Sequence, residues 1–152
     1  MPRIEMSKLV EKMDLKNLTP DVDLSGIYLE EPEVNRPALQ LTGYFDHFDN
    51  QRIQIIGYVE YTYLEHLSRE RRLEVYEQFL SYDMPCLIYT TKTTPDGDML
   101  RMAIERNIPI FTAHKTTTSF MAEIIRRLNV ELAPCISIHG VLVDVYRSEE
   151  RR

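Results

Sequence analysis

The residues best equipped for chemistry in this sequence stand at 113–119, in a loop between an apolar strand-like run and an amphipathic helix. The loop reads Ala-His-Lys-Thr-Thr-Thr-Ser, so Lys115 offers a positive charge and Thr116 and Thr117 offer hydroxyl donors. Free backbone amides and the helix dipole at the start of a helix favour an anion. The loop therefore predicts an anion-binding site, although N-capping by Thr116 or Thr117 explains the same residues without a ligand.

A second loop rich in lysine and threonine, at 91–95, follows the preceding apolar strand and contains Lys92. The carboxyl ends of parallel strands share one edge of a sheet, and α/β folds usually bind their ligands at that edge. We therefore expect the two loops to lie together, which adds Lys92 to Lys115, Thr116 and Thr117 as a candidate for anion binding.

His139 interrupts an apolar, β-branched run at 136–146 that is typical of a strand. An imidazole titrates near neutral pH and can bind phosphate oxygens or transfer a proton. Taken from the residues alone, a polar strand residue next to Gly140 is the favoured interpretation, and the catalytic role is the alternative.

The sequence gives little support to other chemistry. Asp46, His47 and Asp49 suggest metal ligands, but no second cluster completes a site at a recognisable spacing, so a solvated turn is the better interpretation. Cys86 and Cys135 stand in apolar settings typical of buried, reduced thiols. We therefore predict that the chain holds no metal and no cofactor of its own.

Alternating strands and helices must position these residues. Strands are predicted at 51–57, 85–90 and 108–112, and helices at 58–82 with a break near Ser68, at 98–107, and from Thr116 or Thr117 to Leu128. This order predicts an α/β fold with a mostly parallel sheet of about five strands between helices.

Three further elements are predicted upstream of residue 51. Ser7 could cap a first helix, and residues 24–29 could form a strand. A short helix is predicted at 35–43, with Asn35 as its cap and Gly43 as its stop.

Composition narrows the class of protein. The 152 residues are 43% hydrophobic and 28% charged, which is typical of one globular domain. A net charge of −6 argues against non-specific nucleic-acid binding. The sequence contains no apolar run long enough for a membrane span and no signal-peptide core, so we expect a cytoplasmic protein without membrane contact.

Several segments resemble one known family, HPr kinase/phosphorylase. Residues 36–46 (Arg-Pro-Ala-Leu-Gln-Leu-Thr-Gly-Tyr-Phe-Asp), 52–57 and 60–64 are similar to the N-terminal domain of these bacterial enzymes. Residues 116–119 and the His-Gly-Val-Leu-Val-Asp-Val-Tyr run at 139–146 are similar to later segments in the same order. The resemblance covers nearly the whole chain.

The resemblance implies the N-terminal domain of an enzyme that phosphorylates a serine of the phosphocarrier protein HPr with ATP or pyrophosphate and Mg²⁺, and removes that phosphate by phosphorolysis. It also implies a fold like the N-terminal domains of cell-wall-building Mur ligases. His139 would act in the active site of the complete enzyme. HPr would bind through the catalytic domain, and the complete protein would self-associate.

One family feature is missing from these 152 residues, a phosphate-binding loop of the form G-x-x-x-x-G-K-[ST]. Backbone amides and a lysine of that loop hold the phosphates, so phosphoryl transfer by this chain alone is implausible. We expect an N-terminal domain at 1–133, a linker and first catalytic strand at 134–146, and a tail at 147–152. The alternative is a stand-alone sensor of small anions or metabolites, or a protein-interaction domain, with the same fold.

Overall fold

The computed structural model describes residues 2–133. His139, the predicted strand at 136–146 and the boundaries expected at 134–146 and 147–152 lie outside the described residues.

The described chain is built around one five-stranded sheet. Its spatial order is β2 (Lys16–Asn17), β7 (Ile110–Thr112), β6 (Leu87–Tyr89), β5 (Ile53–Ile56) and β4 (Val34–Asn35). The strands from β4 to β7 are parallel, and β2 is antiparallel to β7. This architecture confirms the predicted α/β fold with a mostly parallel sheet of about five strands. A small antiparallel ribbon pairs β1 (Ile4–Glu5) with β3 (Tyr28–Leu29).

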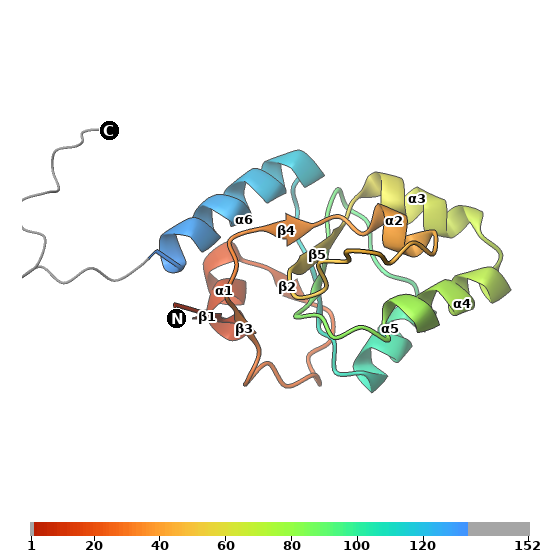
Figure 1. The fold of residues 1–152 in the computed structure, drawn as a ribbon, viewed down its shortest axis with the longest axis horizontal. Coiled ribbons are helices and arrows are strands. Elements are labelled where there is room, and N and C mark those ends of the chain that lie inside the picture. Colours follow the sequence, from red (N-terminus) through yellow and green to blue (C-terminus); the bar gives the residue numbers. More distant parts are fainter. Residues whose placement is uncertain (1, 134–152) are drawn as a thin grey trace, which may run out of the picture.

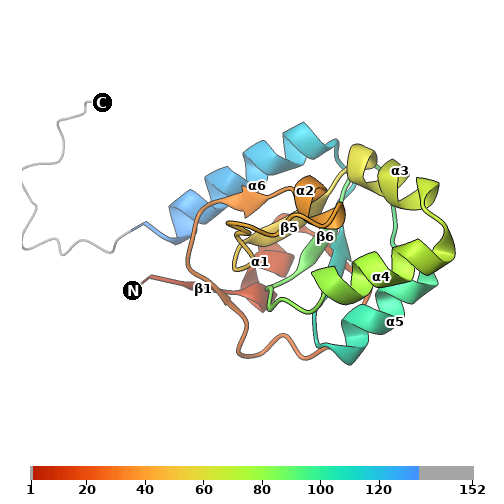
Figure 2. The ribbon, with the colours of Figure 1, turned by 45° about the vertical axis from the view of Figure 1, so that its right-hand side comes forward.

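Helices cover both faces of the sheet. They are α1 (Met6–Met13), α2 (Ala38–Leu41), α3 (Tyr58–His66), α4 (Arg69–Phe79), α5 (Gly97–Glu105) and α6 (Thr117–Glu131). Figures 1 and 2 show α1 and α6 together on one side, and α3, α4 and α5 on the other. The short α2 lies against α3 and α4.

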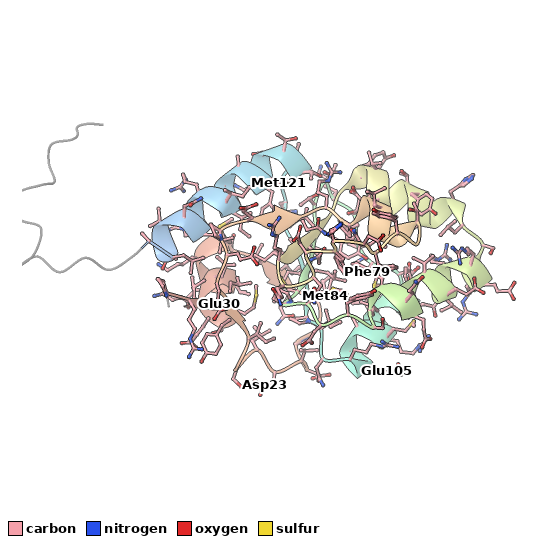
Figure 3. All side chains as sticks on the ribbon, viewed as in Figure 1. Asp23, Glu30, Phe79, Met84, Glu105 and Met121 are labelled. Atoms are coloured by element: carbon pink, nitrogen blue, oxygen red, sulfur yellow. The ribbon has the colours of Figure 1, made fainter. Side chains whose placement is uncertain are left out.

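Alternation along the strands divides the interior into two cores. Ile53, Ile55 and Ile88 face α1 and α6, whereas Ile56 and Leu87 face α3, α4 and α5. Successive side chains of a strand point to opposite faces, so a sheet covered on both sides needs continuous apolar runs. Figure 3 places Phe79 and Met84 inside the second core, where they are 0% and 6% exposed.

The break predicted in the long helical segment is confirmed at Ser68. Its hydroxyl accepts a hydrogen bond from the backbone amide of Arg71 at 3.1 Å, which caps α4 and separates it from α3.

Two local predictions upstream are wrong, and a third is confirmed only in part. Ser7 lies inside α1, which begins one residue earlier after Glu5. Asn35 belongs to β4 and donates its amide to Gln54 Oε1 at 2.7 Å, so α2 begins after Pro37 instead. Only Tyr28 and Leu29 of the predicted strand at 24–29 are paired. For Asn35, a tertiary partner overrides the local preference for a cap.

Candidate functional site

The carboxyl edge of the sheet gathers the first turns after four parallel strands, and Gly57 lies at the centre of this edge. A Cβ atom at Gly57 would lie 2.7 Å from both Arg36 Nη2 and Thr117 Oγ1. A real Cβ does not approach heavy atoms that closely, so glycine allows the segments after β4, β5 and β7 to converge.

Glu60 links this convergence to the start of α3. Its buried side chain accepts hydrogen bonds at Oε1 from the Gly57 amide at 2.7 Å and from Arg36 Nη2 at 2.8 Å. The carboxylate thereby satisfies a free amide of the helix and balances the charge of Arg36. The protein itself fills the anion position at the start of α3.

Among the predicted site residues in the described range, Thr117 is the most buried. Its hydroxyl lies 2.7 Å from Thr90 Oγ1 and 3.2 Å from Thr91 Oγ1. The backbone amide of Thr91 donates to the carbonyl of Lys115 at 2.8 Å. The expectation that the loops at 91–95 and 113–119 lie together is therefore confirmed.

The remaining predicted residues lie on the outside of these loops. Thr116 caps α6, because its hydroxyl accepts a hydrogen bond from the Ser119 amide at 3.3 Å. Lys115 pairs with Glu123, with Nζ 2.6 Å from Oε1. Lys92 is exposed at a positive φ of 59°. The capping interpretation thus accounts for Thr116, and Lys115 already has an acidic partner.

A cavity of about 420 Å³ opens beside this cluster between α3, α4 and the segment that joins β6 to α5. Its lining consists of Tyr61, Leu64, Glu65, Arg72, Tyr76, Tyr89, Thr94, Pro95 and Asp96. Tyr89 is the last residue of β6, so the cavity lies at the carboxyl end of the sheet, where ligands of α/β folds usually bind.

Asp96 organises the polar side of the cavity. Its Oδ1 accepts the Met99 amide at 2.8 Å and caps α5, while its Oδ2 accepts the Tyr76 hydroxyl at 2.8 Å. Arg72 Nε lies 3.1 Å from the same Oδ2, as an ion pair without an aligned hydrogen bond. Arg72 Nη1 donates to the backbone carbonyls of Leu64 and Leu67. The Arg72–Asp96 pair therefore joins α3, α4 and α5 in one network.

Tyr89 differs from the other buried groups of this network. It is 2% exposed, and its hydroxyl has no protein hydrogen-bond partner in the described range but is not one of the fully buried unpaired atoms there, so it touches the water of the cavity. Burial raises the pKa of Tyr89 and of Tyr76, so both phenols stay protonated at neutral pH. Tyr89 brings a free hydroxyl to the wall of the cavity.

Sequence reasoning did not identify this cavity. One signal was present, because Tyr61 with Glu65 and Arg72 with Tyr76 are spaced four residues apart and share helix faces. The meeting of those faces with Tyr89 and Asp96 depends on the packing of α3 and α4 over the sheet.

Neither a metal site nor a membrane-spanning helix is found in residues 2–133. No group of three or more histidine, cysteine, aspartate or glutamate side chains in this range could hold a metal ion, and Asp46, His47 and Asp49 form none. No helix of the same range has the length and apolar character needed to cross a membrane.

Comparisons with known proteins give consistent matches. The sequence model of a family described as HPr Serine kinase N terminus matches residues 4–128. The HPr kinase/phosphorylase of Lachnoclostridium phytofermentans is 53% identical over 146 residues, covering 96% of this chain and 47% of that protein. The one of Alkaliphilus metalliredigens is 37% identical with the same coverage. The chain spans about half the length of the curated relatives it matches.

Among solved structures, the CBS and DRTGG regulatory region of Clostridium perfringens pyrophosphatase, complexed with diadenosine tetraphosphate, aligns with a TM-score of 0.49 and 16% identity. The alignment covers 86% of this chain and 47% of that structure.

Proposed function

Because this chain belongs to the family of HPr serine kinase N-terminal domains, we propose that it is the accessory, regulatory domain of a bifunctional kinase and phosphorylase. The whole protein would phosphorylate a serine of HPr with ATP or pyrophosphate and Mg²⁺. It would remove the same phosphate by phosphorolysis and so regulate carbon metabolism.

The family match over residues 4–128 carries this proposal. The relatives named HPr kinase/phosphorylase are about twice as long as this chain, which leaves room for a catalytic part in the whole protein. The missing G-x-x-x-x-G-K-[ST] loop agrees, since phosphoryl transfer depends on groups that hold the phosphates in place.

The finer parts of the proposal follow from the family. HPr would bind the catalytic part, His139 would act there beside the transferred phosphate, and the whole protein would be a cytoplasmic homo-oligomer. The described residues would supply regulation without catalysis.

A direct test compares this chain with the intact L. phytofermentans relative. Each protein is incubated with HPr, ATP and Mg²⁺, and phosphoserine on HPr is measured by mass spectrometry. We expect transfer by the relative and none by this chain. Transfer by this chain would overturn its accessory role, and failure of the intact relative would overturn the activity proposed for the whole protein.

A second candidate is a sensor of small anions at the loops 91–95 and 113–119. Two observations favour it. The two loops are in contact, and Lys92, Lys115, Thr116 and Thr117 all belong to them. Thermal shift with phosphate, pyrophosphate, ATP and phosphorylated sugars tests it. A shift that Lys92→Gln and Lys115→Gln reduce would support the sensor, and no shift with any anion would remove it.

A further inference from the structure

The cavity beside Asp96 has a wall made largely of phenols and charged side chains. Three phenols from Tyr61, Tyr76 and Tyr89 surround it, together with the threonine hydroxyl of Thr94. Leu64 and Pro95 add apolar surface. The wall therefore suits a ligand with an apolar body and one strongly polar end.

The charges of the lining do not cancel. Two carboxylates, Glu65 and Asp96, face one guanidinium, Arg72. Arg72 lies 3.1 Å from Asp96, and its Nη1 already donates to two backbone carbonyls. The charge of Arg72 is thus balanced within the network, which leaves Glu65 as the unbalanced charge at the rim.

The hydroxyl of Tyr89 is a second group on the wall that a ligand could use. Tyr89 is 2% exposed and lines the cavity, and its hydroxyl oxygen is not among the fully buried side-chain atoms of the described range that lack a partner, so it keeps contact with the water of the cavity. Tyr76, buried to the same degree, gives its hydroxyl to Asp96 at 2.8 Å. The Tyr89 hydroxyl is therefore available to a group that enters the cavity, whereas the Tyr76 hydroxyl is already occupied.

From these observations we propose that the cavity binds a small organic ammonium ion, with its cationic head beside Glu65 and the Tyr89 hydroxyl and its apolar body against Leu64 and Pro95. Phenol oxygens and carboxylates accept hydrogen bonds from an ammonium group, and phenol rings attract a cation by their electron-rich faces. An anion would meet the unbalanced carboxylate instead and would be repelled.

This inference is independent of the proposed function, because it uses only the lining of the cavity. It also differs from the anion-sensor candidate in place and in charge. The sensor would use Lys92 and Lys115 at the loop tips, whereas the cavity lies beneath the segment that leads to α5.

Three probes of nearly equal shape but different charge test whether charge decides the binding. They are 2-phenylethylamine, 2-phenylethanol and phenylacetate. Each is titrated into the whole chain in a calorimeter at low salt and neutral pH. We expect the amine to bind about tenfold more tightly than the alcohol, which corresponds to about 1.4 kcal/mol, because the ammonium group gains a favourable contact with the carboxylate. We expect no binding of phenylacetate. Equal affinity for amine and alcohol, or no binding of the amine, would overturn the proposal.

Variants locate the binding. Tyr89→Phe removes only the free hydroxyl, and Glu65→Gln removes only the exposed charge, so both variants should fold normally and each should weaken amine binding about tenfold. Glu11→Gln, an exposed carboxylate on α1 across the sheet, is the matched control and should leave binding unchanged. Equal loss in the control would show a general charge effect and would count against the cavity.

Discussion

The two faces of the sheet are formed by the same strands but carry different kinds of side chain. The face under α1 and α6 is lined by aliphatic residues and phenylalanines such as Ile55, Phe111 and Phe120, each at most 1% exposed. The face under α3, α4 and α5 contains buried tyrosines, Tyr76 and Tyr89, and opens into a cavity at its carboxyl end. A difference of one residue along a strand decides which face a side chain serves.

The two faces therefore contribute differently to the stability of this domain and to its capacity to bind a ligand. A closed apolar core stabilises the fold in proportion to the apolar area it removes from water. A face with polar side chains beside an opening buries less apolar area and is stabilised less by it. Its polar groups, however, can hold a ligand.

The largest effect is expected in the closed core. Phe120→Ala removes a side chain of α6 that is 1% exposed, and a cavity left by a buried phenylalanine costs about 3–5 kcal/mol of unfolding free energy. Urea denaturation measures the loss. A loss below about 1 kcal/mol would show that the α1/α6 face is not the main source of stability.

The next effect concerns the carboxyl edge. Gly57→Ala would push a methyl group against Arg36 Nη2 and Thr117 Oγ1, each 2.7 Å away, and should cost about 1–3 kcal/mol in unfolding free energy. Gly97→Ala is the matched control, because a Cβ there meets nothing within 4 Å and the residue begins α5. Its effect should be neutral or stabilising by about 0.4–1 kcal/mol. Similar losses in both variants would contradict the role given to Gly57.

A smaller effect separates the two tyrosines of the open face. Tyr76→Phe removes the hydrogen bond to Asp96 and should cost about 1–2 kcal/mol, because one partner of that bond is charged. Tyr89→Phe removes a hydroxyl without a described partner and should cost nothing. Thermal unfolding of the two variants side by side gives the answer. A loss in Tyr89→Phe as large as that in Tyr76→Phe would mean that the Tyr89 hydroxyl has an internal role.

The smallest effect is a pH dependence on the outer surface of the open face. Arg69 of α4 donates hydrogen bonds to Asp98 of α5 at 2.9 and 3.1 Å and thereby holds the pKa of Asp98 below its usual value. The pair therefore adds stability above the pKa of aspartate in the unfolded chain, and this stability is lost as pH falls through the lower pKa of the folded state.

Acid titration of unfolding in the Asp98→Asn variant measures that contribution. The variant should show a shallower loss of stability at acid pH than the parent chain. Parallel curves for the two proteins would show that the surface pair contributes nothing measurable, as many exposed pairs do not.

Much of the fold was predictable because its signals are local. Continuous apolar runs marked β5, β6 and β7, and the serine at 68 marked the break between α3 and α4. The short strands β2 and β4 were not predicted, because two residues carry no periodicity and pair only where a neighbouring strand is already in place. Asn35 shows the same limit, since its strong preference for caps yields to a bond with Gln54 from the next strand.

The candidate sites likewise contain some features that the sequence predicted and others that depend on packing. The nearness of the loops at 91–95 and 113–119 followed from parallel strands, and Thr116 as a cap followed from residue type. The pairing of Lys115 with Glu123 spans eight residues around a helix start, and no pattern in the sequence predicted it. The cavity needed four separate segments to meet.

The sequence by itself determined the family, the α/β class and the order of the main elements, because residue types and short spacings encode them. Only the tertiary structure decided which polar groups are satisfied by the protein and which remain free. Glu60 fills the start of α3 and Asp96 the start of α5, whereas Tyr89 reaches a cavity wall with its hydroxyl unused. The physical reason is that a buried hydrogen bond depends on the positions of both partners, and residues distant in the chain acquire those positions only by packing.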